Sequence, residues 1–309
     1  MASRYAVGET YSTGWSLTSG GEAGAPKPVE GDLCIWDAHS AALMVLDEAP
    51  AAGILMVCDA PQATLGLGAF DISAALFDWN APVIGSGNIT VTGDGGDIYP
   101  TADFSNHTGW IIFAETVYTE INVPGLTAPP DVLLATAGKT ATVDVFWKVR
   151  ALSLANATQT LDVDQADQYV NAVGFQFAAG ILDNPGTVNV GAGGLTQIDG
   201  TVLGGGTVNV AGAASITHAD WSGFTGRLNL RGAGPHTLSD ADGALALGAF
   251  TINNHGVLHM TNGGGVSGTP PTVNTLYRHN RPQLAGDWAS LQVNTRLHYP
   301  RRLGPGTAA

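Results

Sequence analysis

The stretch GTVNVGAGGLTQIDGTVLGGGTVNV, from Gly186 to Val210, contains the segment GTVNV twice, and the second copy starts 20 residues after the first. A looser third copy, GRLNL, lies another 20 residues along the chain, from Gly226 to Leu230. In each copy apolar and polar residues alternate, which is the period of a strand with one buried face. The segments LTQI, SITH and PHTL follow the three copies at the same interval, and each precedes a polar turn.

A unit of this size cannot bury its apolar face alone, whereas stacked units can, and fixed periods of roughly 20 to 50 residues are typical of solenoids. Parallel stacking predicts one internal column made by Val188, Val208 and Leu228. It also predicts one external column of side-chain amides that hydrogen-bond along the stack, made by Asn189, Asn209 and Asn229. We therefore predict an all-β fold with β-solenoid repeats of about 20 residues. The alternative is an antiparallel sandwich or barrel.

Four regions are expected along the chain. Residues 1–50 contain several aromatic residues and read as an N-terminal anchoring or capping module. Residues 51–130 are β-rich but irregularly spaced, residues 131–262 hold the solenoid repeats, and residues 263–309 read as a basic, extended and irregular arm. The Pro-rich segment PGLTAPP, residues 124–130, is the candidate boundary, although one continuous body with a long loop there is the alternative.

Charge is unevenly distributed. The chain has 309 residues, a net charge of −14 and only 12% charged residues, with 42 glycines. Five arginines and one acid lie after residue 262, so the body before it is strongly acidic. An acidic body argues against nucleic-acid binding, which needs a basic surface. The abundance of glycine and the scarcity of charge are typical of a β-protein with many tight turns rather than of a disordered chain.

Paired carboxylates are the first candidates for chemistry, because glycosidases need two acids roughly 5 to 9.5 Å apart. The candidates are Asp162, Asp164 and Asp167 in LDVDQADQ, Asp94 and Asp97 in TGDGGD, and Asp240 with Asp242. Asp and Gly are also ordinary turn formers, so we favour turns over catalysis at all of these positions. The segment TGDGGD lacks the frame of a known calcium loop, so no calcium site is predicted.

Histidines and cysteines give no metal-binding pattern. His255 and His259 lie four apart in a strand-like segment, where this spacing does not place two ligands on one face, and His218 and His236 are scattered. Cys34 and Cys58 lie in apolar runs, and we predict two buried free thiols, with a disulfide between them as the alternative. No phosphate-binding loop or nucleophile motif is present, and no cofactor is predicted. No apolar run resembles a secretory signal or a membrane span, so folding in a cytoplasm is expected.

The segment RYAVGETYSTGWSLTSGGEAGAPKPVEGDLCIWDAHS, from Arg4 to Ser40, resembles the opening segment of bacteriophage virion structural proteins. The matching residues are Arg4, Tyr5, Val7, Gly8, Trp15, Ser16, Thr18 to Gly21, Pro28, Asp32, Trp36, Asp37, Ala38 and Ser40. The departures are Ala6, where that pattern has tryptophan, and Glu9, where it has a second glycine. The resemblance covers about an eighth of the chain and implies a non-enzymatic phage structural protein with β-helical repeats, a head decoration or a fibre.

Under this resemblance the chain would sit in a virion assembled in the host cytoplasm, bound to the major capsid protein or to other virion proteins. Tyr5, Trp15 and Trp36 are the candidate anchoring residues. The candidate contacts with a shell or a neighbouring subunit are Arg278, Arg281, Arg296, Arg301, Arg302, Trp288 and Tyr299. An arm of this kind predicts a homo-oligomer, for which a trimer is expected, and neither nucleic acid nor membrane is an expected partner.

Three functions from different classes are consistent with the sequence. The first is the structural virion protein, a capsid decoration or head-fibre subunit. The second is a tail fibre or spike that recognises host surface glycans through aromatic residues such as Trp221. The third is a polysaccharide-degrading spike, which would need a carboxylate cluster such as Asp162 and Asp164 on one face. The first is preferred because no catalytic motif is recognised and aromatic residues make up only 7% of the chain.

Overall fold

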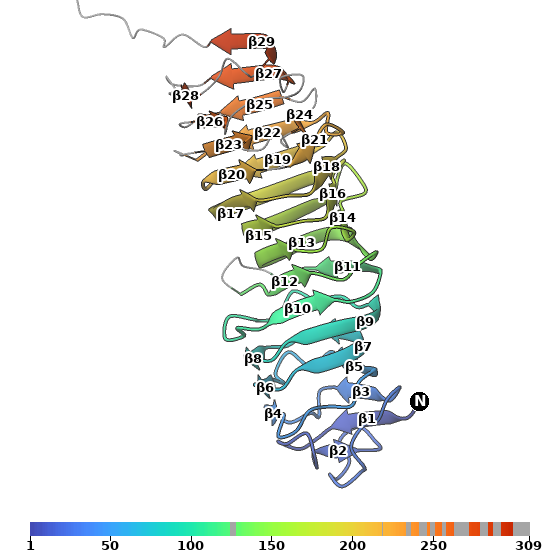
Figure 1. The fold of residues 1–309 in the computed structure, drawn as a ribbon. Coiled ribbons are helices and arrows are strands. Elements are labelled where there is room, and N and C mark those ends of the chain that lie inside the picture. Colours follow the sequence, from blue (N-terminus) through green and yellow to red (C-terminus); the bar gives the residue numbers. More distant parts are fainter. Residues whose placement is uncertain are drawn as a thin grey trace, which may run out of the picture.

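The computed structural model describes residues 1–123, 128–217, 219–232, 236–240, 246–247, 251–254, 258–262, 272–278, 284–286 and 292–298. Side chains are described up to Leu238, apart from Asp94, and at Ile252. Every element in these residues is a strand, and almost every pairing is parallel, between strands one coil apart. The strands stack into one elongated body, as Figure 1 shows, so the predicted β-solenoid is confirmed and the antiparallel alternative is excluded.

From residue 117 onward the coil has three faces. The first face contains β14 (Thr160–Asp162), β16 (Ile181–Asp183), β18 (Thr201–Leu203), β21 (Asp220–Trp221) and β24 (Ala246–Leu247). The second contains the end of β11 (Val117–Ile121), whose first part lies on the first face. It also contains the first parts of β15 (Tyr169–Phe177) and β17 (Thr187–Gln197), β19 (Thr207–Val210), β22 (Arg227–Leu230), β25 (Thr251–Asn254), β27 (Thr272–Arg278) and β29 (Gln292–His298).

The third face follows the second along the chain, and the long strands β15 and β17 run over both faces. It contains β10 (Trp110–Phe113), β12 (Asp131–Leu134), the ends of β15 and β17, β20 (Ala214–Thr217), β23 (His236–Asp240), β26 (Leu258–Asn262) and β28 (Leu284–Gly286). The long strand β13 (Thr140–Leu154) runs across all three faces, because its successive segments pair with β14, β15 and β12. The repeat unit therefore has three strands, where the sequence predicted two. The strand that the sequence did not reveal is the one on the first face. In β18 it is three residues long, too short to display an alternating pattern.

The first coils are built from β1 (Ser3–Ala6), β3 (Leu33–Trp36), β5 (Ile54–Cys58), β7 (Ile72–Trp79) and β9 (Ile89–Gly95), which pair in parallel in this order. A small second sheet contains β4 (Met44–Val45), β6 (Leu65–Gly68) and β8 (Val83–Gly85). The short strand β2 (Trp15–Ser16) lies antiparallel on β1. This hairpin occupies the outer edge of β1, so the first strand does not present a bare edge at that end.

One internal column of side chains runs through the solenoid. Val188, Val208 and Leu228 are in register and at most 2% exposed, which confirms the predicted column. Strand register carries the same column backward through Val170, Trp147, Ile121, Ile98, Trp79, Cys58 and Trp36, and forward to Ile252. All of these side chains are buried. Burial of such apolar area is the main favourable term in folding, because it removes that area from water.

The external asparagine column is also confirmed, and it starts one coil earlier than predicted. Asn189 Nδ2 donates to Asn171 Oδ1, Asn209 to Asn189, and Asn229 to Asn209, each at 2.7 Å. In each case the Nδ2 of one asparagine therefore donates to the Oδ1 of the asparagine one coil earlier. A side-chain hydrogen bond between neighbouring strands fixes their register, because a slip of one residue would break all of the bonds together.

The glycine before each TVNV segment is required by close approach of the coils. A Cβ at Gly206 would lie 2.1 Å from the backbone oxygen of Gly186, and one at Gly226 would lie 1.9 Å from the oxygen of Gly206. No side chain fits at such distances. The repeated glycine is thus explained by the stacking of one turn directly on the next.

The four regions expected from the sequence share one strand ladder in the structure. Across the segment 124–130, β10 pairs with β12 and β11 pairs with β13, so the ladder is continuous and no domain boundary lies there. Residues 1–50 form the first coils of the same ladder through β1 and β3. Within the expected arm, β27, β28 and β29 continue the parallel pairing up to His298. Turns of unequal length, rather than a change of fold, produce the irregular spacing in the sequence.

Candidate functional site

The predicted anchoring residues are mostly part of the core. Trp15 and Trp36 are 0% and 1% exposed, and their rings meet edge to face at 5.5 Å. Trp36 in turn contacts Trp79 at 5.0 Å between ring centroids. Tyr5 is half-buried in β1. The two tryptophans therefore stabilise the first coils from inside, and they are unable to touch a partner.

The predicted shell contacts are only partly placed. Arg278 lies at the end of β27 and Arg296 lies in β29, both in strands whose side chains are not described. Arg281, Trp288, Tyr299, Arg301 and Arg302 lie outside the described residues. These residues remain predictions of a partner surface.

The predicted carboxylate pair lies at the edge of the first face. Asp162 ends β14, and its register partner in the next coil is Asp183, which the sequence analysis missed. Burial raises the pKa of Asp162, and the nearby carboxylates of Asp164 and Asp183 add to this shift. Asp167 is exposed in the turn that follows. Within the described residues no group of three His, Cys, Asp or Glu side chains is arranged to hold a metal ion.

The other predicted acids have structural surroundings or lie outside the description. Asp97 Oδ1 accepts a hydrogen bond from the backbone N–H of Glu120 at 3.0 Å, which joins two coils. Asp94 and Asp240 lie in β9 and β23 without described side chains, and Asp242 lies outside the described residues.

The histidines and cysteines are accounted for by the core where they are described. His236 is buried and donates from Nε2 to the backbone oxygen of Gly232 at 3.1 Å, and burial lowers its pKa. His218 and His255 lie outside the described residues, and His259 is known only as a backbone position in β26. Cys34 and Cys58 are both buried and free, which confirms the predicted thiols.

The predicted glycan platform is not available. Trp221 is 1% exposed, and its Nε1 donates to Gln197 Oε1 at 2.8 Å inside the solenoid. Its ring meets Phe224 edge to face at 5.2 Å. Trp221 therefore belongs to the core, and the tail-fibre hypothesis loses the residue that the sequence offered for it.

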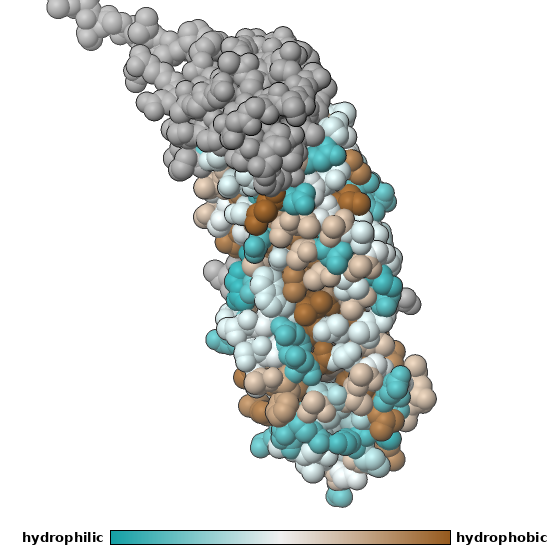
Figure 2. All heavy atoms as spheres, in the orientation of Figure 1, coloured by the Kyte–Doolittle hydropathy of each residue, from teal (hydrophilic) through white to brown (hydrophobic). Residues whose placement is uncertain are grey.

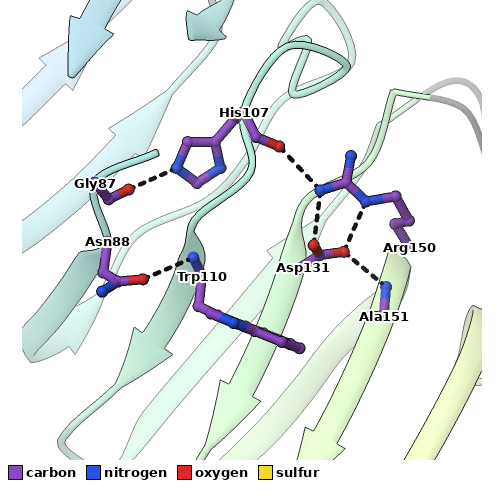
Figure 3. A network of polar contacts seen from close by, with 7 residues as sticks. All are labelled: Gly87, Asn88, His107, Trp110, Asp131, Arg150 and Ala151. Carbon is purple, nitrogen blue, oxygen red and sulfur yellow. Dashed lines mark hydrogen bonds and ion pairs between the residues drawn. The ribbon is translucent and has the colours of Figure 1, made fainter. Parts of the chain in front are cut away.

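A polar network that the sequence analysis missed ties three coils together on the third face (Figure 3). Arg150 Nε donates to Asp131 Oδ1 at 2.8 Å, and Arg150 Nη2 donates to Asp131 Oδ2 at 2.7 Å. The same Nη2 donates to the backbone oxygen of His107 at 2.9 Å. The backbone N–H of Ala151 donates to Asp131 Oδ1 at 3.0 Å. Such a two-pronged arginine–carboxylate pair is strong and directional.

His107 anchors the loop at the edge of this network. Its ring is buried, donates from Nε2 to the backbone oxygen of Gly87 at 2.9 Å, and meets Phe104 edge to face. Burial lowers the pKa of His107, and the positive charge of Arg150 lowers it further. The imidazole is therefore neutral at pH 7, as a structural histidine rather than a proton-transfer group.

Beside the network lies a groove of about 270 Å³. It is lined by Trp110, Ala151, Leu152, Ser153, Gly174, Phe175, Gln176, Gly193, Gly194 and Thr196. Trp110 is half-buried on β10, and Figure 3 shows its indole on the same face as the Asp131–Arg150 pair. No charged side chain lines this groove. It combines an aromatic wall, a floor of small residues and a polar rim.

The surface around the groove is mixed in character. Figure 2 shows apolar and polar side chains interspersed over the described coils, with apolar side chains in small groups rather than one broad patch. The exposed large apolar side chains among the described residues run along the sequence from Met1 to Ile198. The described part of the face in Figure 2 therefore shows no single large apolar patch.

Neither a protein-family model, nor a curated protein, nor a solved structure matches this chain. Among the described residues, none forms a helix with the length and hydropathy that a membrane crossing requires.

Proposed function

We propose that this chain is a non-enzymatic structural protein of a bacteriophage virion, a capsid decoration or head-fibre subunit that attaches to the shell and projects a β-solenoid. The observation that carries the proposal is the continuous parallel ladder from β1 to β29, which makes an elongated body. A solenoid of this kind is suited to extend from a surface, because each coil is stabilised by its neighbours.

The N-terminal segment supports the phage assignment. Arg4 to Ser40 carries the resemblance to virion proteins, and it forms the first coils and the β1–β2 hairpin. Asp32 holds this segment together, because its Oδ1 accepts the backbone N–H of Ala2 at 2.8 Å, and its Oδ2 lies 3.5 Å from Arg4 Nε. The matching residues Trp15 and Trp36 are buried, so the resemblance reflects the way this end folds.

The partner surface is proposed at the C-terminal end. Its arginines would meet the major capsid protein or another virion protein, while the acidic body stays in solvent. The proposal includes a homo-oligomer, a trimer, in which this end joins the subunits. Light scattering on the purified chain tests that part: a mass three times that of the 31.6-kDa subunit supports it, and a monomer at micromolar concentration contradicts it.

Immunogold electron microscopy tests the proposal as a whole. Antibody raised against the full chain is applied to phage particles purified from the host that makes the chain. Label distributed over the heads supports a decoration or head-fibre role. Label confined to the tail tip contradicts the head location, and particles without label contradict the virion role altogether.

A further inference from the structure

We infer that the groove beside Trp110 binds a neutral oligosaccharide. This inference goes beyond the proposed structural role and does not depend on it, because binding by the purified chain can be measured whether or not the chain belongs to a particle. It rests on three observations at the groove: its shape, its polar rim and its lack of charge.

The shape follows from strand register. Trp110 pairs with Asp131, Ala151 pairs with Gly174, and Gly174 pairs with Gly194, so positions on successive coils line up along the solenoid axis. Beyond the indole of Trp110, the small residues Ala151, Gly174 and Gly194 therefore follow one another along the floor, beside Leu152 and Phe175. At Gly174 the nearest atoms to an added Cβ would be those of the Gly193 backbone, at 3.6 Å or more, so a methyl group would fit there in ordinary contact.

An aromatic wall over a flat floor suits a sugar ring. A pyranose has an apolar face of C–H groups that packs against an indole, whereas its hydroxyls point outward to polar partners. The volume of about 270 Å³ lies just below the range of small-molecule sites, which is roughly 300 to 1,000 Å³. One or two rings would fill it, and the chain of sugars would continue along the axis.

The rim supplies polar groups. Ser153 lines the groove and is 7% exposed. The exposed side chains of Gln176 and Thr196 follow Ser153 on the next two coils, in register. Together they offer an amide and two hydroxyls to the hydroxyls of a sugar.

The absence of charge selects a neutral ligand. The nearest cation is Arg150, which is already held by Asp131 and by the backbone oxygen of His107. The groove therefore offers no free positive group to a phosphate, a sulfate or a carboxylate. An added peptide strand is also unfavoured, because β12, β13, β15 and β17 already pair on both sides and leave no free edge.

Saturation-transfer NMR on the full chain tests the inference. The probes are cellotriose, maltotriose and chitotriose at millimolar concentration, with a sulfated disaccharide from heparin as the charged comparison. We expect saturable binding of at least one neutral trisaccharide and none of the heparin disaccharide. Binding of the heparin disaccharide alone, or of no neutral probe, would overturn the inference.

Variants then locate the site. Trp110→Ala removes the wall, and Gly174→Val fills the floor; each is expected to weaken the binding of the neutral probe at least tenfold. Tyr118→Ala is the matched control, because Tyr118 is an aromatic residue 55% exposed on β11, away from the groove. Unchanged binding in both groove variants, or an equal loss in the control, would contradict the assignment. Circular dichroism and thermal unfolding verify that each variant is folded.

Discussion

The coils between Thr187 and Leu230 and the coils between Leu33 and Trp79 share one ladder but fill it differently. In the later coils the internal column contains Val188, Val208 and Leu228, side chains of nearly equal size. In the first coils the same column contains Trp36, Cys58 and Trp79, whose sizes differ widely. The later coils also carry the asparagine ladder, whereas aromatic contacts predominate in the first coils.

The difference shows that a solenoid does not require a periodic sequence. Parallel pairing of backbones is satisfied in both regions, and only the filling of the interior changes. Where the internal side chains have similar sizes, successive coils are alike, and the sequence shows a repeat. Large and small side chains alternate in the first coils, so neighbouring rings interlock edge to face and the repeat disappears from the sequence.

The largest expected effect is at Trp79. This residue is 0% exposed, contacts Trp36 and Phe77, and donates from Nε1 to the backbone oxygen of Ala81 at 2.9 Å. Trp79→Ala should lower the free energy of unfolding by about 3 to 5 kcal/mol, because the cavity has no neighbour able to fill it. Val208→Ala, at the same column position in the later coils, should cost less. Urea unfolding of both variants makes the comparison, and an equal or smaller loss in Trp79→Ala would contradict it.

The second-largest effect is expected at the glycines that allow the later coils to stack closely. Gly206→Ala places a Cβ 2.1 Å from the Gly186 oxygen, so the coils must separate, at a cost of about 1 to 3 kcal/mol. Gly205→Ala is the control, because its Cβ would meet only Thr225 Oγ1, at 3.5 Å. Thermal unfolding of the two variants should differ clearly. If both lose the same stability, close stacking is not the reason for the glycine.

The asparagine ladder should contribute less than the core. Asn209→Ala removes two amide hydrogen bonds, one to Asn189 and one to Asn229, and should cost about 1 to 2 kcal/mol. Ser215→Ala, at an exposed position of β20, should change stability by no more than about 0.5 kcal/mol. Hydrogen exchange should also show faster opening of β19 in the first variant. Unchanged exchange there would mean that the ladder does not hold the register.

The smallest effect concerns pH and the first coils. Burial raises the pKa of Asp78, and the nearby carboxylates of Asp97 and Asp59 add to the shift. A carboxyl whose pKa is raised on folding contributes stability below its unfolded pKa, about 3.9, and loses that contribution as pH rises through the folded value. Asp78→Asn should therefore stabilise the protein more at pH 7 than at pH 4.

The control for this pH effect is Asp167→Asn, in an exposed turn. Unfolding free energies of the wild type and both variants are compared at the two pH values. A gain in Asp78→Asn that is equal at pH 4 and pH 7 would contradict the role of the buried carboxyl. A gain of the same size in Asp167→Asn would mean that it reflects net charge alone.

The parts of the fold that repeat could be predicted from the sequence. The Val188 column and the Asn189 ladder were predictable because identical residues recur at identical intervals. The third strand of each coil was not, since Thr201–Leu203 shows only one buried residue, Val202. Trp36 reads as an anchor in the sequence because its aromatic character is visible, whereas turns of unequal length hide its place in the internal column.

The candidate groove could not be predicted from the sequence for the same reason. Trp110, Ala151 and Gly174 come together through the register of four successive coils separated by turns of different length. No spacing in the sequence relates them. The pairing of Arg150 with Asp131 is hidden in the same way, although an arginine in an acid-rich body is a signal that it has a partner.

Disulfide trapping across the expected domain boundary tests the continuous ladder most directly. Tyr118 and Thr142 are register partners on either side of residues 124–130, and neighbouring parallel strands lie about 4.8 Å apart, within the reach of a disulfide. The native thiols will not interfere, because burial raises the pKa of Cys34 to about 12 and that of Cys58 to about 11. The control pair is Tyr118→Cys with Asp162→Cys, which is two coils apart and out of reach. The account predicts a bridge in Tyr118→Cys with Thr142→Cys alone, detected by peptide mass spectrometry; no bridge there, or one in the control pair, would contradict it.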